Sequence, residues 1–293
     1  GRGAEEARRE AARLGRVGQA RQERRVVRMQ RGPSAESKDH IVAAYARVGG
    51  GVDRVAVETP IAMVYNGLSH AVMMATPDDL GDFALGFSLS EGIIDSSEQF
   101  LGYDETKTAK GIELNIDIVT GRFEALKQHR RSLVGRTGCG LCGIESLEQA
   151  IPKPSSIESA FQISHGALEN ALATLTDKQV LQKQTGAVHA AAWCNEDGEV
   201  QFLREDIGRH NALDKLLGAI NKLGKTEGFV LVTSRASYEM VYKVASANVA
   251  ILASVSAPTS LAIELADQCR LTLIAFTRQG RHVVYSGLQR LVS

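Results

Sequence analysis

The chain has 293 residues, of which 44% are hydrophobic and 23% charged, and its 34 Lys and Arg balance 34 Asp and Glu. This composition is typical of a globular protein with room for two domains of ordinary size. No apolar run approaches the roughly 18 residues of a membrane helix, and the charged N-terminus lacks the apolar segment of a signal peptide. We therefore expect a protein that does not enter a membrane. Its four cysteines show no disulfide-framework spacing, which predicts a cytoplasmic location.

The balanced charge hides a basic N-terminal arm. Residues 1–31 carry ten Arg and four Glu, whereas the rest of the chain carries 24 Lys and Arg against 30 Asp and Glu. A basic arm can contact nucleic acid, a membrane or an acidic partner. Because this one has no apolar stripe with which to pack, we favour a solvated, disordered arm and linker over residues 1–40, with no nucleic-acid partner.

Residues 41–155 carry the pattern of a small α+β domain. Two extended runs flank the dipeptide Asn66-Gly67, which strongly favours a hairpin turn. The next segment predicts a helix with Thr76 as its N-cap. Alternating apolar residues then predict a second hairpin, made of 111–119 and 122–126 around Thr120 and Gly121.

Residues 156–293 have the rhythm of an α/β domain. Amphipathic stretches alternate with short, continuously apolar runs, which is typical of parallel strands in a sheet covered on both faces. Right-handed crossovers would join these strands. The predicted order is helix 157–176, strand 185–194, strand 199–205, helix 206–224, strand 229–234, helix 238–250, strand 250–256, helix 258–268 and strand 271–277.

Polar residues follow the apolar strands, at the edge where a parallel sheet opens its ligand crevice. They are Thr233, Ser234 and Arg235, then residues 256–260, then Arg278, Gln279, Gly280 and Arg281. Arginine side chains and the helix N-terminus near Pro258 both suit phosphate oxygens. We therefore predict an anionic ligand at this edge. The alternative is a set of surface turns with stray charges.

The stretch REDIGRHN places Arg204, Asp206, Arg209, His210 and Asn211 at a strand-to-helix junction. Such a polar cluster can be a binding site. It can equally be a well-capped helix, with Asp206 as N-cap and solvated Arg and His side chains. The sequence does not decide between the two.

His189 lies in an apolar strand, where a histidine is more often hydrogen-bonded in the core than a ligand. Its setting is similar to the His-Ala-Glu motif of zinc nucleoside deaminases. However, Ala191 stands where the proton-transferring Glu should be, and no Pro-Cys-x-x-Cys motif follows. Because hydrolytic deamination needs both the Glu and the zinc ligands, we expect neither deaminase activity nor bound zinc.

Cys139 and Cys142 form a Cys-x-x-Cys pair in the glycine-rich stretch RTGCGLCG. A structural zinc site needs four N or S ligands, and no suitably spaced Cys or His completes one within a single chain. A thioredoxin-like dithiol would lie at a helix start directly after a strand. A third hypothesis is a mobile thiolate, activated by the preceding Arg residues, that carries sulfane sulfur. The other cysteines, Cys194 and Cys269, lie in apolar surroundings and are expected to be inert.

Seven stretches carry a more specific signal. They are TPDDLGDFALGFSLSEGII, RTGCGLCGIESL, VHAAAW, REDIGRHNALDKLLG, LVTSRASYEMV, SAPTSLAIELA and LIAFTRQGR. In this order they resemble the formate dehydrogenase accessory sulfurtransferases, the FdhD family. The resemblance covers roughly residues 50–290 and leaves only the basic arm outside it.

The resemblance implies a fold, a reaction and partners. The fold would be α/β, with a cytidine-deaminase-like three-layer C-terminal domain at 156–293, a smaller α+β N-terminal domain at 41–155, and a homodimeric assembly. The reaction would be sulfur transfer, with Cys139 as the persulfide carrier and Cys142 as its accessory. A cysteine desulfurase would load the sulfur. The bis-molybdopterin guanine dinucleotide (bis-MGD) molybdenum cofactor, bound as substrate, would receive it for formate dehydrogenase.

The cofactor-binding segment that the resemblance implies is Phe276, Thr277, Arg278, Gln279, Gly280 and Arg281. Ser234 and Arg235 join it from the strand-end pattern. Further candidates are His189, Asp206, Arg209 and His210. The alternative function is a non-enzymatic chaperone that binds the molybdenum cofactor, with cysteines that serve docking or redox sensing.

Overall fold

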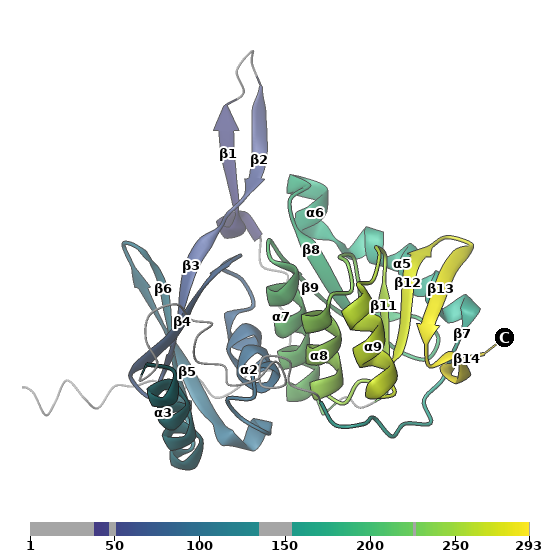
Figure 1. Cartoon of the computed structure of the whole chain (residues 1–293). Coiled ribbons are helices and arrows are strands. Elements are labelled where there is room, and N and C mark those ends of the chain that lie inside the picture. The colour runs from purple at the N-terminus through teal and green to yellow at the C-terminus, as the bar shows by residue number, and fades with distance from the viewer. Residues whose placement is uncertain (1–37, 47–50, 135–153, 225–226, 293) are drawn as a thin grey trace, which may run out of the picture. The chain divides into compact units, whose positions relative to one another are not determined.

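The computed structural model describes residues 38–46, 51–134, 154–224 and 227–292, and residues 37–293 form one compact unit. The basic arm, Cys139 and Cys142 lie outside the described residues. The described part is a mixed α/β structure with two main sheets, each with its own hydrophobic core (Figure 1). None of its helices is long and apolar enough to cross a bilayer. The domain boundary at residues 155–156 stays a prediction.

The first sheet has four strands in the order β4-β3-β6-β5. They are β3 (Thr59–Tyr65), β4 (Leu68–Ala75), β5 (Phe100–Thr108) and β6 (Gly111–Ile118). The predicted hairpin turn is confirmed, since Asn66 and Gly67 have positive φ and join β3 to β4. Alternate residues of β3 and β6, such as Met63 and Leu114, are fully buried against helices α2 (Leu80–Ser90) and α3 (Thr120–Val134).

The predicted second hairpin is wrong. Strand β6 pairs with β5, which the polar sequence of residues 100–108 did not reveal, and residues 120–134 form α3. The side chains of Phe123 and Leu126 lie three residues apart and pack on the first core. This helical spacing outweighs the short run of alternation, because helical geometry brings both side chains to one face.

The predicted N-cap of α2 is also wrong. The helix begins at Leu80, after Asp79 in the left-handed conformation, and Asp79 makes no side-chain cap bond. Thr76 is fully buried instead. Its backbone N–H donates to the carboxylate of Asp206 (3.0 Å), and its hydroxyl accepts from the N–H of Ile207 (3.2 Å). A tertiary contact has therefore taken the place of the local cap.

A two-stranded hairpin, β1 (Val42–Ala46) with β2 (Val52–Ala56), precedes the first sheet. Its base packs on residues that are distant in sequence. Ile41 is buried with Leu181 and Val188, and Arg54 donates to the side-chain oxygen of Gln184 (3.1 Å). The hairpin is thus attached to helix α6 (Val180–Thr185).

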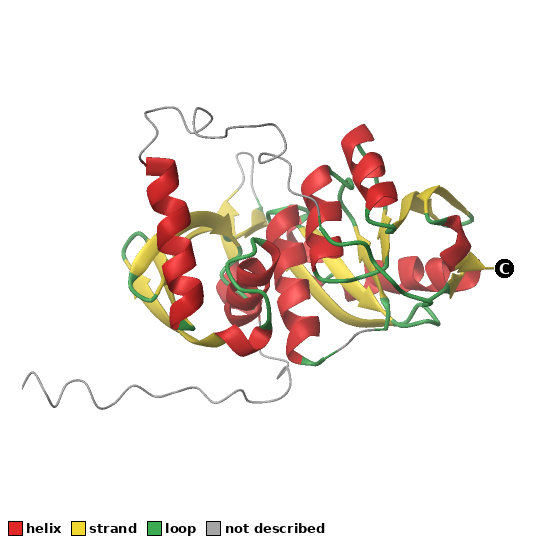
Figure 2. Cartoon of the chain, turned by 60° about the horizontal axis from the view of Figure 1, so that its bottom comes forward, coloured by secondary structure: helices red, strands yellow, loops and turns green. Residues whose placement is uncertain are grey.

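The second sheet has six strands in the order β13-β12-β11-β10-β8-β9. They are β8 (His189–Cys194), β9 (Val200–Asp206), β10 (Phe229–Val232), β11 (Ile251–Ser254), β12 (Thr272–Arg278) and β13 (Arg281–Ser286). Helices α7 (Arg209–Lys222), α8 (Tyr238–Ser246) and α9 (Ser260–Gln268) lie side by side on one face, and α5 (His165–Lys178) lies on the other (Figures 1 and 2). A short pair, β7 (Ile163–Ser164) with β14 (Leu291–Val292), lies outside this sheet.

The predicted parallel sheet is correct only at its centre. Strands β10, β11 and β12 are parallel, whereas β8, β9 and β13 run antiparallel to their neighbours. Strand β13 was not predicted, and α5 begins at His165 rather than at residue 157. A helix within the predicted range 206–224 is confirmed as α7, and every residue from Asn211 to Ile220 in it is buried. A likeness of this layering to cytidine deaminases stays a prediction.

Helices α2 and α7 approach each other through glycine. A Cβ atom built on Gly86 would overlap the carbonyl oxygen of Asp214, and one built on Gly218 would overlap that of Asp82. Only a residue without a side chain permits this backbone contact. The two helices therefore pack as closely as their main chains allow and join the two halves of the compact unit.

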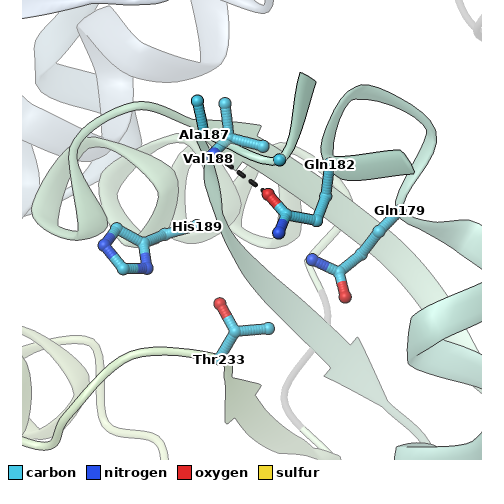
Figure 3. Close-up of a pocket in the computed structure, with 7 residues that line it drawn as sticks. Gln179, Gln182, Ala187, Val188, His189 and Thr233 are labelled. Carbon is cyan, nitrogen blue, oxygen red and sulfur yellow. Dashed lines mark hydrogen bonds between the residues drawn. The ribbon is translucent and has the colours of Figure 1, made fainter. Parts of the chain in front are cut away.

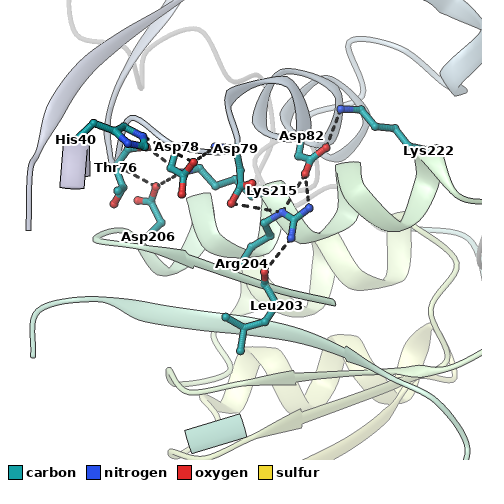
Figure 4. A network of polar contacts seen from close by, with 10 residues as sticks. All are labelled: His40, Thr76, Asp78, Asp79, Asp82, Leu203, Arg204, Asp206, Lys215 and Lys222. Carbon is teal, nitrogen blue, oxygen red and sulfur yellow. Dashed lines mark hydrogen bonds and ion pairs between the residues drawn. The ribbon is translucent and has the colours of Figure 1, made fainter. Parts of the chain in front are cut away.

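Buried ion pairs reinforce this contact. Lys215 of α7 and Asp206 of β9 have no exposed side-chain surface, and their charged atoms lie 2.7 Å apart. The Lys215 ammonium also donates to the carbonyl oxygen of Thr76 (2.8 Å). Figure 4 shows this network beside a second one, in which Arg204 and Lys222 pair with Asp82 at 2.7 Å each.

The glycine contact can be tested by adding one methyl group. We expect Gly86→Ala to lower the free energy of unfolding by about 1–3 kcal/mol, because the methyl group forces the two helix backbones apart. Urea unfolding followed by circular dichroism measures this change. The matched control is Gly121→Ala in α3, where a Cβ atom meets nothing within 4 Å and alanine should stabilise the helix by up to about 1 kcal/mol. Equal stability of the two variants would contradict the close helix contact.

Candidate functional site

One edge of the second sheet gathers most of the predicted site residues. Along this edge lie the β12–β13 turn, the ends of β11 and β10, the start of β8 and the end of β9. Because β8 is antiparallel to β10, its first residue, His189, lies beside the end of β10. The edge thus brings together residues 276–281, Ser234, Arg235, His189, and the start of α7 with Arg209 and His210.

A cavity of about 490 Å³ lies at the β8 end of this edge (Figure 3). Its volume is in the usual range for a small-molecule pocket. Its lining consists of Gln179, Gln182, Gly186, Ala187, Val188, His189 and Thr233. The sequence indicated only His189 and Thr233 here. The two glutamines belong to no catalytic motif, and only folding brings them to the edge.

The first turn of α7 carries polar side-chain groups that lack a hydrogen-bond partner among the described residues. Its N-cap is Gly208, which provides no side-chain cap. Arg209 Nε and His210 Nε2 are buried and have no hydrogen-bond partner in the described part of the chain. A helix N-terminus and a guanidinium group both attract anions. These unpaired donors favour the binding-site hypothesis over the alternative of a well-capped helix.

The two histidines at this edge are held neutral. Burial lowers the pKa of His189 and of His210, and the positive charge of Arg209 lowers both further. The carboxylate of Glu239 partly opposes this effect at His210, from 3.9 Å. A bound anion would stabilise the protonated imidazoles, so binding and protonation should be coupled.

Asp206 lies behind the edge and does not open onto it. Its carboxylate is fully buried and accepts hydrogen bonds from the N–H groups of Thr76 and Gly208 and from the side chain of Asn211. With Lys215 as ion-pair partner, these bonds fix the turn that presents the start of α7. Asp206 is therefore not the N-cap, and in this arrangement it shapes the site from behind.

Arg204 and Asn211 face the α2 half. Arg204 Nη2 pairs with Asp82 at 2.7 Å, and Asn211 donates to the carbonyl oxygen of Met74 (2.8 Å). Neither side chain is directed to the strand-end edge. Both tie the turn at the start of α7 to the first sheet and its helix.

Strand β12 (Thr272–Arg278) carries strain just before the β12–β13 turn, at the other end of the edge. Phe276 has a φ of 51°, which a bulky residue rarely adopts. The strand pairing shifts register between Ala275 and Arg278. Thr277 is buried, and within the described ranges its hydroxyl has no hydrogen-bond partner. Strain beside an unsatisfied polar group indicates a turn shaped for binding.

The remaining predicted residues are exposed to a ligand, with the exception of Ser234. Arg278, Gln279, Gly280 and Arg281 are exposed around the β12–β13 turn, and Arg235 is exposed after β10. Ser234 is buried, and its hydroxyl donates to the carbonyl oxygen of Arg235 (3.2 Å). The edge therefore carries exposed arginines after β10 and around the β12–β13 turn, while the anionic ligand that the strand-end pattern predicted stays a prediction.

Metal and thiol chemistry have little support in the described residues. Within them, no group of three or more His, Cys, Asp or Glu could hold a metal ion. Cys194 and Cys269 are buried free thiols, and burial raises the pKa of both, that of Cys194 to about 12. This supports the expectation that these two thiols are inert. Cys139 and Cys142, the predicted carriers, lie outside the described residues.

Comparison with known proteins adds independent information. The model of the FdhD/NarQ family matches residues 56–292. A protein named sulfur carrier protein FdhD from Cupriavidus necator is 53% identical over 241 residues, covering 82% of this chain and 84% of the relative. The protein of that name from Xanthomonas oryzae pv. oryzae is also 53% identical, covering 82% and 86%. The crystal structure of a candidate formate dehydrogenase accessory protein from Desulfotalea psychrophila is similar, with a TM-score of 0.64 at 25% identity, covering 86% of this chain and 97% of that one.

The cationic edge predicts a measurable affinity for phosphates. We expect Arg209→Ala, Arg235→Ala, Arg278→Ala or Arg281→Ala each to weaken GDP binding by about 1–3 kcal/mol, as for lost charge-assisted hydrogen bonds. Isothermal titration calorimetry measures the affinity. Arg54→Ala on the hairpin is the control for the loss of one positive charge, since its side chain contacts Gln184 instead. Unchanged GDP affinity in all four site variants would show that the anion binds elsewhere on the protein.

Because His189 and His210 are neutral in the free protein, the affinity for an anion should depend on pH. Sulfate keeps its charge between pH 5.5 and 7.5, so tighter sulfate binding at the lower pH would report protonation of His189 and His210. We expect this increase because an anion raises pKa values that burial has lowered. Without the anion, stability should fall as the pH drops from about 6.5 towards the lowered pKa values, because the folded state then binds fewer protons than the unfolded state.

The control for this experiment is the double variant His189→Gln and His210→Gln, which cannot titrate in this range. Its sulfate affinity should be nearly independent of pH. An affinity that rises equally in the wild type and in the double variant would contradict the role of these histidines.

Proposed function

Because this chain belongs to the FdhD/NarQ family, we propose that it is a sulfurtransferase that serves formate dehydrogenase. Cys139 carries sulfur as a persulfide, a cysteine desulfurase supplies it, and the bis-MGD molybdenum cofactor, bound as substrate, receives it. The observation that supports this proposal most is the family match over residues 56–292, which spans the Cys-x-x-Cys pair. Its curated relatives are named sulfur carrier proteins.

The loading step is a thiolate–persulfide exchange. The Cys139 thiolate attacks the outer sulfur of the desulfurase persulfide, a new S–S bond forms on Cys139, and the donor cysteine leaves as thiolate. The outer sulfur keeps its oxidation state, so no external oxidant or reductant is needed. The arginines that precede the pair would favour the attacking thiolate.

Cys142 has a defined accessory chemistry in this proposal. Its thiolate attacks the inner sulfur of the Cys139 persulfide, forms a Cys139–Cys142 disulfide and releases hydrosulfide, with the two thiols supplying both electrons. An external thiol would then reduce the disulfide. This reaction assists release and does not replace Cys139 as the carrier.

The strand-end edge would hold the cofactor. The phosphate groups of bis-MGD are anionic, and the edge offers exposed Arg235, Arg278 and Arg281 together with Arg209 Nε and Thr277 Oγ1, two buried groups without partners in the described residues. Charge and unpaired donors therefore suit these phosphates. We also propose a cytoplasmic homodimer, which analytical ultracentrifugation of the full chain would test.

The alternative is a chaperone that binds the cofactor without transferring sulfur. Both functions need the cationic edge, so cofactor binding does not separate them. Only the sulfurtransferase needs a cysteine that becomes loaded. Sulfane sulfur on Cys139 after incubation with a desulfurase and cysteine is the deciding observation.

The two cysteines should differ in substitution experiments. We expect Cys139→Ala to abolish sulfur loading and activation of formate dehydrogenase, because it removes the attacking thiolate, while GDP binding persists. Cys142→Ala should retain measurable loading. Mass spectrometry of each variant after desulfurase treatment detects the added sulfur.

Cys194→Ala provides the control for loss of a thiol, since Cys194 is buried in the second core and should not be loaded. Sulfur found on Cys142 alone, with Cys139→Ala still activating the dehydrogenase, would reverse the assignment. Absence of loading in the wild type would favour the chaperone.

A further inference from the structure

We propose that the cavity beside His189 binds the planar, uncharged heterocycle of the ligand, a purine or a pterin. Gln179 and Gln182 determine which heterocycle is accepted. The proposal rests on the proposed function, because it assumes that a nucleotide-like cofactor lies along the strand-end edge. It adds the residues that determine which heterocycle is accepted.

The orientation of Gln182 is fixed by the fold. Its side-chain oxygen accepts a hydrogen bond from the backbone N–H of Val188 (3.0 Å) (Figure 3). Since an amide group has one oxygen and one NH₂, this bond leaves the NH₂ group to serve as donor on the pocket side. A donor held in one orientation loses little conformational freedom on binding, which favours selectivity.

Gln179 adds a second amide at the same wall. It is buried, at 8% exposure, and in the part of the chain that the structure describes its side-chain amide makes no hydrogen bond. Figure 3 shows this amide turned towards the cavity that it lines, where a ligand can reach it. A ligand that offers both a donor and an acceptor would satisfy it.

His189 completes a neutral lining. Because burial and Arg209 keep its imidazole uncharged at neutral pH, it offers one donor and one acceptor. No Asp, Glu, Lys or Arg is among the described residues that line the cavity. Such a lining does not suit a phosphate, which needs positive charge. It suits a flat heterocycle whose edge carries N–H donors and carbonyl or ring-nitrogen acceptors.

One ligand could reach both the cavity beside His189 and the cationic β12–β13 turn. His189 starts β8, and the cationic β12–β13 turn lies three strands away in the order β12-β11-β10-β8. With neighbouring strands about 4.8 Å apart, the two regions are separated by about 14 Å. A ligand with phosphates attached to a heterocycle can place the heterocycle in the neutral cavity and its phosphates on the arginines.

The test separates the heterocycle from the phosphates. GDP, ADP, neopterin monophosphate and inorganic pyrophosphate are titrated into the full chain by calorimetry. Gln182→Glu keeps the acceptor for Val188 and removes the NH₂ donor, and Gln179→Leu removes both the oxygen and the NH₂ of its amide. We expect each variant to weaken binding of the favoured heterocycle by about tenfold or more and to change pyrophosphate binding by less than about twofold.

The control is Gln184→Glu, which adds the same charge to α6, but its side chain pairs with Arg54 outside the cavity. It should bind all four compounds like the wild type. Tighter binding of GDP than of neopterin monophosphate would identify a purine pocket, and the reverse order a pterin pocket.

Two results would overturn the proposal, and they differ. If the wild type binds GDP and pyrophosphate but both glutamine variants bind GDP like the wild type, the heterocycle lies elsewhere and only this inference fails. If the wild type binds none of the four compounds, the anion site of the proposed function fails with it. Melting temperatures of all variants, measured by circular dichroism, exclude misfolding as the cause of lost affinity.

Discussion

The buried carboxylate of Asp206 joins β9, α7 and the segment before α2. It has no exposed surface, yet it meets the Lys215 ammonium at 2.7 Å and accepts bonds from Thr76 and Gly208. Burying two charges is expensive, and only a fully satisfied geometry offsets the cost of desolvation. Removing either partner of such a pair typically costs about 3–5 kcal/mol, because the other charge then stays buried and unpaired. The contact therefore specifies one arrangement of β9, α7 and the segment before α2.

Another buried network, centred on Asp214, joins α8 to the contact between α2 and α7. Lys243 of α8 pairs with Asp214 of α7 at 3.0 Å and with Glu91 after α2 at 2.7 Å. Ser90 of α2 donates to Asp214 (2.6 Å) and accepts from Lys243 (2.8 Å). With the glycine contact between α2 and α7, these bonds align three helices. They keep the first turn of α7, which carries Arg209 and His210, fixed relative to the edge of the second sheet.

Charged and uncharged side chains occupy different parts of the strand-end edge. The arginines near β12, β10 and α7 provide the positive potential that phosphates need. The cavity at the start of β8 is lined by amides, a hydroxyl and an uncharged imidazole. This division follows from the sheet order, because the antiparallel strand β8 adds its first residue, His189, beside the end of β10, whereas the arginines follow β10 and flank the β12–β13 turn. The strained Phe276 marks the opposite end.

Elements that depend on local spacing could be predicted from the sequence. The continuous apolar runs of β10 to β12, helix α7 and the Asn66-Gly67 turn are encoded within a few residues, so periodicity and turn chemistry suffice to predict them. The strand-end arginines followed from the same runs. Only the tertiary structure decided the role of Asp206, the start of α2 and the Gln179–Gln182 cavity. Thr76 and Asp206 are 130 residues apart, and a capping preference of about 1 kcal/mol yields to a buried ionic contact worth several. Long-range energies of this kind leave no local pattern in a sequence.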